Sequence, residues 1–220
     1  MSDPTDRFAG MTIAEFVERL ASPEPIPGGG SASAMAASLS AALLAMVARL
    51  STGRPKYEAY AATHGRAETA GAAATGRFLE LADQDAAAYG TFAAAMKLPR
   101  ETSEEQEARA GALRRAAREA AIVPMEMVRA CRSLAAEIEA MAGRSNLNAA
   151  SDVAVAALLV DAAAHGAAAN VLVNLPSVKD EGFEASMTAD LMLHLKEIED
   201  LAAHAREVAA SGRLRSPETA

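Results

Sequence analysis

Apolar residues recur at helical spacing along most of the chain, and short polar or proline-containing stretches interrupt them. The first such segment opens with Thr12 and Glu15, which have the form of a capping box. Its apolar residues fall on one helical face: Ile13, Phe16, Val17 and Leu20. The pattern predicts a short amphipathic helix that stops at Ser22-Pro23.

A proline- and glycine-rich connector follows, with prolines at 23, 25 and 27 and glycines at 28, 29 and 30. Ser31 is expected to cap a second helix that ends near Leu50. Residues 32–48 are uncharged and about as long as the minimum for crossing a bilayer. They are mostly Ala and Ser, and Arg49 follows directly. We therefore expect a helix buried on all sides inside a bundle rather than a membrane span.

Two longer helical stretches come next. Pro55 closes a linker, and helical pattern then persists over residues 57–97 and ends at Leu98-Pro99. Four glycines lie in this stretch, so we expect a kink or an extra segment near one of them.

Thr102 and Glu105 repeat the capping-box pattern and open the next stretch, which runs to Ala142 before a stop at Gly143. Pro124 lies inside it and predicts a kink or a split into two helices.

The last third of the chain contains two more predicted helices. A polar turn at 144–148 precedes an apolar helix that leads to Asn174 and is ended by Pro176. A final amphipathic helix over 184–210 has one apolar side: Met187, Leu191, Leu195 and Ile198. We expect one domain over residues 1–220, with 1–10 and 212–220 frayed.

Composition points to an all-α fold. Hydrophobic residues make up 51% of the 220, but 57 are alanines and aromatic residues reach only 4%. Alanine has the highest helix propensity, and the aromatic and β-branched residues that favour strands are scarce. The expected architecture is an up-and-down bundle of about five to six helices, including long kinked ones.

Charge and cysteine content narrow the function classes. The formal net charge is −8, from 21 Lys and Arg against 29 Asp and Glu, which argues against a nucleic-acid-binding surface. The single cysteine, Cys131, excludes an internal disulfide and favours a reducing cytoplasm, with the thiol as a small buried hydrophobe. The first residues do not resemble a signal peptide, and we expect no membrane association.

The first candidate for chemistry is the run Gly28-Gly29-Gly30-Ser31 at the start of the buried second helix. Successive glycines permit positive φ angles and close backbone approach, and the free amides of a helix N-terminus favour negative charge. A tight turn packed against a neighbouring helix explains such a run equally well.

The second candidate is Asp85, which shares a helical face with Tyr89 and is surrounded by alanines. Desolvation raises the pKa of a carboxyl group in such a setting, which suits a general acid or base near neutral pH. The competing interpretation is a solvated helix face.

The third candidate is a set of polar residues on the apolar last third. Asn148 and Asp152 are one helical turn apart and follow Arg144; Asn170 and Asn174 form another such pair. Each buried polar group without a partner costs roughly 1–3 kcal/mol. The two asparagines therefore either clamp a neighbouring helix or line a polar pocket.

Neither a metal ion nor a nucleotide is implied by the sequence. The four histidines have no metal-ligand spacing, and no Walker loop or dinucleotide fingerprint is present.

Taken together, these segments resemble the folate cyclodeaminase/cyclohydrolase family of one-carbon metabolism. The resemblance runs through most of the chain and rests on the order and separation of several motifs. They are Pro27–Ser31, Ala45–Leu50, Lys56-Tyr57, Asp85–Tyr89, Leu98-Pro99, Val123-Pro124, Asn146–Asp152 and Asn170–Asn174.

The resemblance implies an all-helical homodimer in the cytoplasm. The enzyme would act at the N5/N10 bridge of a tetrahydrofolate derivative, and its substrates would include polyglutamylated forms. The activity is that of a 5,10-methenyltetrahydrofolate cyclohydrolase or of a 5-formimidoyltetrahydrofolate cyclodeaminase, with no cofactor beyond the substrate. Within it, we assign proton transfer to Asp85 and pterin binding to Asp152, with the two roles exchangeable.

Further substrate contacts are expected from the glycine run Gly28, Gly29, Gly30 and Ser31, from the amides of Asn148, Asn170 and Asn174, and from the cations Lys56 and Arg144, which suit glutamyl carboxylates. The alternative is a non-catalytic, Ala-rich helical dimer that serves as a scaffold or a folate-binding protein.

Overall fold

The computed structural model describes residues 7–217, and this part of the chain is helical and without strands. Six α-helices are present. They are α1 (Ile13–Leu20), α2 (Gly29–Ser51), α3 (Ala61–Met96), α4 (Ser103–Met141), α5 (Ala150–Asn174) and α6 (Glu181–Ser211). Short 3-10 turns precede α1, α3 and α5 and follow α5. The all-α fold and the number of helices predicted from the sequence are confirmed.

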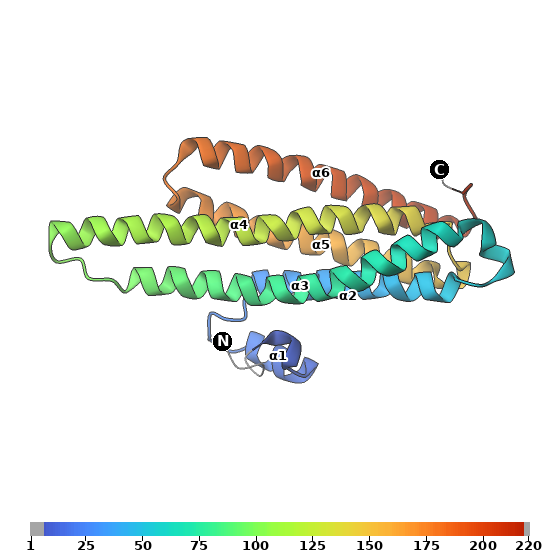
Figure 1. The fold of residues 1–220 in the computed structure, drawn as a ribbon, viewed down its shortest axis with the longest axis horizontal. Coiled ribbons are helices and arrows are strands. Elements are labelled where there is room, and N and C mark those ends of the chain that lie inside the picture. The colour runs from blue at the N-terminus through green and yellow to red at the C-terminus, as the bar shows by residue number, and fades with distance from the viewer. Residues whose placement is uncertain (1–6, 218–220) are drawn as a thin grey trace.

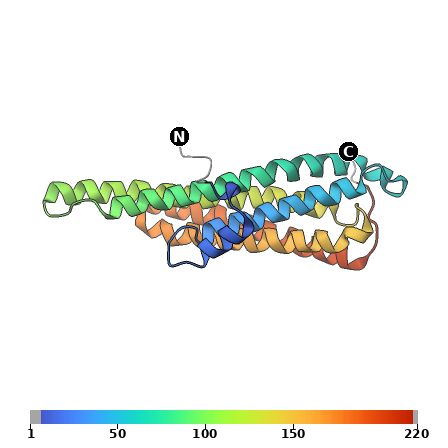
Figure 2. The ribbon, with the colours of Figure 1, turned by 90° about the horizontal axis from the view of Figure 1, so that it is seen from below.

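Helices α2 to α6 run up and down along one long axis, and α1 lies against the side of this bundle (Figure 1). The two longest helices, α3 and α4, form a hairpin that extends beyond the shorter α5–α6 hairpin, as Figure 2 shows from a second direction. α2 packs mainly on α3 and α5, while α4 packs on α3, α5 and α6. A Cβ added to Gly29 would lie 3.7 Å from the Asn170 side chain, so the start of α2 and the end of α5 lie at the same end of the bundle.

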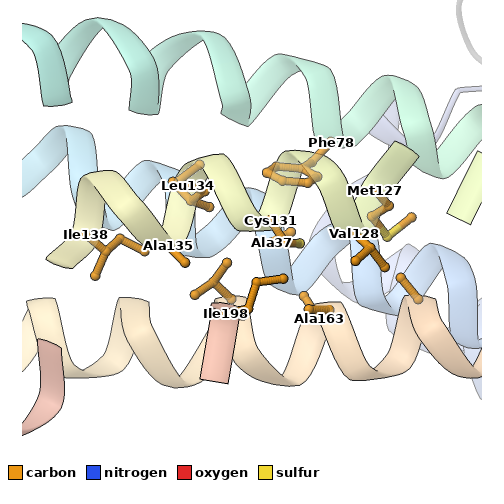
Figure 3. Packing of buried hydrophobic residues seen from close by; sticks show 14 of the residues in the cluster. Ala37, Phe78, Met127, Val128, Cys131, Leu134, Ala135, Ile138, Ala163 and Ile198 are labelled. Carbon is orange, nitrogen blue, oxygen red and sulfur yellow. The ribbon is translucent and has the colours of Figure 1, made fainter. Parts of the chain in front are cut away.

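The core is built from small side chains with a few large ones between them. Phe78, Met127, Val128 and Cys131 meet in its centre (Figure 3). Small residues let helix axes approach closely: a Cβ added to Gly71 on α3 would lie only 2.8 Å from the Ala41 carbonyl oxygen of α2. Burial raises the pKa of the Cys131 thiol to about 12, as expected for a residue that only packs.

Several local signals act as the sequence predicts. Both capping boxes form: Thr12 Oγ1 accepts a hydrogen bond from the Glu15 amide, and Thr102 does the same at α4. Gly143, at φ +69°, follows the end of α4. The apolar side of the last helix is buried as expected.

Two helix predictions need correction. Ser31 does not cap α2, because the helix already begins at Gly29 and its N-cap is Gly28, which has no side chain to cap with. Pro124 does not split α4, which is continuous over 39 residues. The kink or extra segment expected near one of four glycines takes the form of a bend in the N-terminal part of α3 (Figure 1), and residues Pro55–Tyr60 before α3 form a 3-10 turn.

Helix α2 is also not buried on all sides. Its inner face is buried against α3 and α5, but Leu39 is 55% exposed and Leu50 is also exposed. Both α2 and the segment Leu147–Ser177 are long and apolar enough to span a membrane by composition, and 61% of the most apolar window of α2 is buried inside the bundle.

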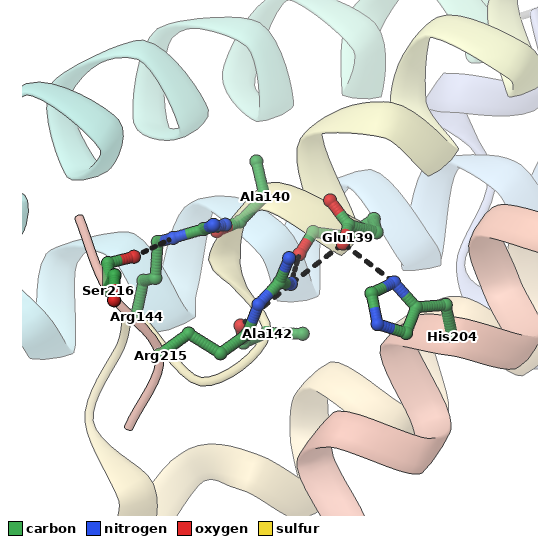
Figure 4. Close-up of polar contacts among 7 residues, drawn as sticks. All are labelled: Glu139, Ala140, Ala142, Arg144, His204, Arg215 and Ser216. Carbon is green, nitrogen blue, oxygen red and sulfur yellow. Dashed lines mark hydrogen bonds and ion pairs between the residues drawn. The ribbon is translucent and has the colours of Figure 1, made fainter. Parts of the chain in front are cut away.

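Residues near both chain ends contact the bundle. Phe8 is only 4% exposed, contacts Phe16, and its amide donates to Asp83. Near the other terminus the Arg215 side chain donates to Glu139 (Figure 4). Tyr60 also donates to the Arg215 carbonyl oxygen. These contacts tie residues near both ends to the bundle; fraying at 1–10 and 212–220 stays a prediction, and residues 1–6 and 218–220 lie outside the described range.

Candidate functional site

A cavity of about 310 Å³ opens where the start of α2 meets the middle of α3 and the end of α5. Its polar lining brings together seven of the residues selected from the sequence: Gly28, Gly29, Gly30, Ser31, Asp85, Asn170 and Asn174. Its apolar lining includes Ile26, Ala86, Tyr89, Phe92, Ala120 and Val173. A polar floor with apolar walls is typical of pockets for small organic ligands.

The glycine run lets the Asp85 side chain approach the backbone of α2 closely, and it does not adopt unusual backbone angles. Gly28 is extended, at φ −127°, and neither Gly29 nor Gly30 has a positive φ. Instead, a Cβ on Gly30 would overlap the Asp85 carboxyl group, with a carboxylate oxygen 2.2 Å away. The absence of a side chain at position 30 is what lets the carboxylate of α3 lie against the first turn of α2.

Asp85 is a desolvated carboxylate without a fixed partner. No hydrogen bond or ion pair to its side chain forms within residues 7–217, and burial raises its pKa from 3.8 to about 6. A group with that pKa both accepts and releases protons near neutral pH. Asp85 is therefore suited to acid–base chemistry, as its alanine-rich surroundings predicted.

The first turn of α2 offers hydrogen-bond donors to the same cavity. No side chain caps this helix end, and the Ser31 side chain is buried at 1% exposure with no hydrogen-bond partner for its Oγ in the described chain. An uncapped helix N-terminus also carries partial positive charge. The free amides of α2 and its partial positive charge thus face the Asp85 carboxylate and any ligand that binds in the cavity.

Asn170 and Asn174 extend the polar lining along α5. Nδ2 of Asn170 donates to the Gly166 carbonyl oxygen at 2.8 Å. Nδ2 of Asn174 donates to the carbonyl oxygens of Ala120, at 2.9 Å, and of Asn170. These bonds fix both side chains, and neither Oδ1 accepts a hydrogen bond from the described residues. Both sequence alternatives therefore hold: Asn174 clamps α5 to α4, and both amides line a polar pocket.

The other four residues selected from the sequence lie at the opposite end of the bundle: Lys56, Arg144, Asn148 and Asp152. Asp152 precedes Asn170 by 18 positions on α5, which corresponds to about 27 Å along the helix. Their expected contact with the Asp85 cavity is therefore wrong within one chain. Sequence order did not reveal that a straight helix separates the two groups.

Arg144 has a structural explanation in place of the predicted contact with substrate carboxylates. Its side chain is buried; Nε donates to the Ser216 carbonyl oxygen and Nη1 to that of Ala140 (Figure 4). Lys56 is exposed and its Nζ lies 5.4 Å from the Tyr57 ring centroid. Asn148 is exposed and Asp152 is partly exposed.

The apolar wall was mostly absent from the site predicted from sequence. Tyr89 was noted beside Asp85, but Phe92 and Val173 were not selected. Phe92 lies seven positions after Asp85 and so shares its helical face, which is a signal that the sequence did contain. Within the described chain, no group of three or more His, Cys, Asp or Glu could hold a metal ion.

Comparison with known proteins identifies relatives of this chain. The family model described as "Formiminotransferase-cyclodeaminase" matches residues 12–193. The chain is 36% identical to a formimidoyltransferase-cyclodeaminase of Sus scrofa over 91% of its length but only 37% of that protein. It thus spans about a third of the length of such two-part relatives.

Other relatives match over nearly their whole length. The chain is 34% identical to a methenyltetrahydrofolate cyclohydrolase of Methylorubrum extorquens, over 88% of this chain and 90% of that protein. A crystal structure of a formiminotetrahydrofolate cyclodeaminase from Thermotoga maritima superposes with a TM-score of 0.83 at 30% identity, over 91% of this chain and 96% of that one.

Proposed function

This chain belongs to the formiminotransferase-cyclodeaminase family, and from that premise we propose that it is a one-carbon folate enzyme acting at the N5/N10 bridge of tetrahydrofolate. The proposal covers opening of the 5,10-methenyl bridge by water and its formation from a formimino group with release of ammonia. The observation that carries it is the Asp85 carboxylate, held without a partner in a cavity lined by uncapped amides and two asparagines.

In the cyclodeaminase reaction, N10 attacks the carbon of the protonated formimino group on N5, and the electron pair of its C=N bond moves onto the formimino nitrogen, which becomes an NH2 group. Asp85 accepts the N10 proton as this bond forms, and a tetrahedral carbon bearing three nitrogens results. Asp85 then returns the proton to the formimino nitrogen, which leaves as ammonia and completes the methenyl bridge. A single carboxyl group with a pKa of about 6 serves as base in the first step and as acid in the second.

In the cyclohydrolase reaction, water adds to the same bridging carbon. Asp85 accepts a proton from that water as the C–O bond forms, and this proton is delivered to N5 as the C–N5 bond breaks. The remaining hydroxyl proton is released to solvent as the carbonyl forms, which gives 10-formyltetrahydrofolate. Both reactions pass through a tetrahedral carbon at one position. One cavity with one proton-transfer group therefore suits either.

The remaining polar groups have binding roles in this proposal. The free Oδ1 atoms of Asn170 and Asn174 accept hydrogen bonds from N–H groups of a flat heterocycle. The amides of Gly29 and Gly30 and the Ser31 hydroxyl donate to oxygen or stabilise negative charge near the reacting carbon. The proposed chemistry needs no cofactor beyond the folate substrate. We also propose that the protein acts in the cytoplasm.

A spectrophotometric assay tests the proposal. Purified protein is offered 5-formimidoyltetrahydrofolate and 5,10-methenyltetrahydrofolate separately, and the methenyl absorption is followed. It rises in the first case for a cyclodeaminase and falls faster than the uncatalysed rate in the second for a cyclohydrolase. Asp85→Asn should lower kcat by about 10²-fold or more with unchanged helix content. Wild-type kcat in that variant would remove Asp85 from the mechanism.

The non-catalytic alternative, a helical scaffold or folate-binding protein, gains no support from relatives that are named as enzymes. Turnover in the assay above excludes it directly. A thermal-shift series with folate analogues separates its two forms, since a specific ligand stabilises the native state by mass action and a scaffold does not respond.

We further propose that the chain forms a homodimer through α2 and α5. Leu39, Val155, Leu158 and Leu172 are large, exposed hydrophobic side chains on these two helices, which pack on each other, and exposed apolar side chains that gather on neighbouring helices are typical of interaction surfaces. A two-fold axis near the middle of α5 would bring the Asp152 end of one copy beside the Asn174 end of the other. Light scattering tests this: Leu158→Glu should yield monomers, whereas a monomeric wild type would refute the dimer.

A further inference from the structure

The attacking water loses two protons in the proposed cyclohydrolase reaction, and a protein group has been assigned to only one of them. Asp85 takes the first proton and its path ends at N5. The second is the hydroxyl proton of the tetrahedral carbon, which must reach solvent as the carbonyl forms. The proposed cyclodeaminase reaction has no such proton, because Asp85 moves the N10 proton to the leaving nitrogen and none is released to solvent.

Tyr89 is the second titratable group in the cavity. Among the residues of the described chain that line this cavity, only Asp85 and Tyr89 have side chains that titrate. The Tyr89 hydroxyl group forms no hydrogen bond with any residue between 7 and 217. A free phenolic hydroxyl group both donates and accepts hydrogen bonds, so it can take up one proton as it gives up another.

The helix directs Tyr89 toward Asp85. The two residues are four positions apart on α3, which places their Cβ atoms on one face at about 5–6 Å from each other. Side chains of a helix tilt toward its N-terminus, so each covers the turn before its own. The Tyr89 side chain is therefore directed over the turn that carries Asp85, and both side chains line the same cavity.

The hydroxyl groups of the cavity differ in their access to water. Tyr89 is 40% exposed, whereas Ser31, which carries the other hydroxyl group, is only 1% exposed. Asp85 lies against the first turn of α2, where burial raises its pKa to about 6. Of the groups that can transfer a proton, Tyr89 is therefore the one in contact with solvent.

We infer that Tyr89 holds the attacking water and passes its second proton to solvent, as a catalytic residue of the cyclohydrolase reaction. This assignment rests on the proposed function. The water donates one hydrogen bond to Asp85 and the other to Tyr89 Oη, which directs an oxygen lone pair at the bridging carbon.

The proton step follows from this arrangement. As the C=O bond forms, the O–H bond of the tetrahedral carbon breaks and its proton moves to Tyr89 Oη. The phenolic proton of Tyr89 moves at the same time to a solvent water. The tyrosine is neutral before and after the step, and the proton released is the one that the overall hydrolysis produces.

The cyclodeaminase reaction depends less on this hydroxyl group. Its amino group occupies the position of the attacking water, but it is covalently attached to the carbon until it leaves. A free water must be held in place, and the loss of its translational and rotational freedom adds to the barrier unless the protein positions it. Tyr89 thus sets the balance between two activities that Asp85 serves equally.

Tyr89→Phe tests the assignment, because it removes the hydroxyl group and keeps the ring. No hydrogen bond within the described chain is lost, so the variant should fold like the wild type. We expect kcat for methenyltetrahydrofolate hydrolysis to fall by about tenfold or more, the effect of one lost hydrogen bond, and kcat for the cyclodeaminase reaction to fall by less than about twofold. The calorimetric Kd of 5-formyltetrahydrofolate should change by less than about twofold, since the ring remains.

Imidazole provides a readout that a purely structural role would not change. This small base can take the second proton in place of the missing hydroxyl group. After subtraction of the rate without enzyme, added imidazole should raise kcat for hydrolysis in Tyr89→Phe and leave the wild-type value unchanged. A Tyr89→Phe variant that is slow in hydrolysis and does not respond to imidazole would overturn the proton path.

Two variants control for the number and the position of hydroxyl groups. Tyr60→Phe removes a hydroxyl group at the other end of α3, where it donates to the Arg215 carbonyl oxygen, and should keep the wild-type ratio of the two kcat values. Tyr89→Phe/Phe92→Tyr keeps the composition and moves the hydroxyl group about 4.5 Å along α3, away from Asp85. It should be as slow in hydrolysis as Tyr89→Phe, and wild-type hydrolysis by this double variant would contradict the assigned position.

The results distinguish this inference from the proposed function. If Tyr89→Phe slows both reactions equally, or leaves hydrolysis unchanged, the role assigned to Tyr89 is wrong and the folate activity stands. The same conclusion follows if the wild type catalyses only the cyclodeaminase reaction. If neither substrate is turned over, the proposed function fails and this inference fails with it.

Discussion

The two ends of helix α2 contain similar buried polar groups and treat them in opposite ways. At the end that carries Ser51, polar groups pair with each other: the Asn146 amide donates to Ser51 Oγ at 2.8 Å, and His64 Nε2 lies 2.8 Å from the Arg144 carbonyl oxygen. At the end that carries Ser31, the hydroxyl and the nearby Asp85 carboxylate have no partner in the described chain.

This difference distinguishes polar groups that stabilise the fold from polar groups that are available to a ligand. A buried polar group that is paired holds the fold together, whereas a buried polar group left unpaired destabilises it and is tolerated where a ligand supplies the partner. Both ends were candidates from sequence alone, since both combine asparagine, serine and charge with alanine-rich helices. Their hydrogen bonds distinguish the structural end of α2 from the end at the candidate site. Matched substitutions at the two ends test this distinction.

The largest contrast is expected between two glycines. Gly30→Ala would push the Asp85 carboxylate away from its position, and a misplacement of about 1 Å in a catalytic group costs roughly 10²-fold in rate. Gly71→Ala, toward the other end, meets backbone atoms of α2 and should instead destabilise the fold by about 1–3 kcal/mol. The measurements are kcat and the free energy of unfolding in urea.

Gly76→Ala is the control for that pair, because an added Cβ there meets open space. It should keep kcat and raise stability slightly, since alanine is the better helix former. The comparison of the two ends breaks down if Gly30→Ala retains wild-type kcat while its unfolding free energy drops as far as that of Gly71→Ala.

The next largest effect concerns Arg144 at the paired end. Arg144→Ala removes two hydrogen bonds to the carbonyl oxygens of Ser216 and Ala140 and leaves these acceptors to find new partners. We expect a loss of about 1–3 kcal/mol in stability, with kcat/KM within a few-fold of wild type. A large rise in KM without loss of stability would restore the substrate-binding role that the sequence suggested for this residue.

How far the sequence predicted the molecule depends on the range of the information required. Local signals sufficed for the helices: the Thr12 and Thr102 capping boxes, the stop at Gly143 and the apolar side of α6 all form. Of the kink or split predicted at Pro124, the split does not occur, because this buried proline lies inside a continuous 39-residue helix.

The candidate site was predicted only in part, because local patterns select polar residues but do not place them in the fold. Asp85, Asn170 and the glycine run were selected by a physical criterion, polar groups among alanines, and the fold brings them to one cavity. Asp152 met the same criterion but lies about 27 Å away along α5. The direction in which each helix runs, and which turns of α4 face α3, are tertiary facts that no local pattern contains.

A pH-dependent effect on stability comes next in size. The folded-state pKa of Asp85 is raised from 3.8 to about 6 by burial, so the native state favours the protonated carboxyl group. The stability that this preference contributes is fully present below about pH 4 and is lost as the pH rises through 6. Asp85→Asn should therefore be more stable than wild type above pH 6, by on the order of 1–3 kcal/mol, and about equal to it near pH 4.

Urea unfolding of both proteins at several pH values measures this difference. The same ionisation predicts that wild-type kcat/KM falls as the pH drops below about 6, because the base form of Asp85 is lost. A stability difference that does not vary with pH would mean that the Asp85 carboxyl group titrates normally and is not desolvated.

The smallest contrast compares the two serines of α2, both 1% exposed. Ser51 Oγ donates to the Val47 carbonyl oxygen and accepts from the Asn146 amide, so Ser51→Ala should cost about 1–3 kcal/mol. Ser31 Oγ has no partner in the described chain, so Ser31→Ala should be neutral or stabilising by up to about 1 kcal/mol without ligand. A bound folate should change the effect of the Ser31 substitution but not that of the Ser51 substitution. The Ser31 hydroxyl then gains an acceptor, so Ser31→Ala should show a smaller ligand-induced rise in Tm than the wild type. Equal losses from both substitutions in the free protein would mean that the two ends of α2 do not differ in how their polar groups are paired.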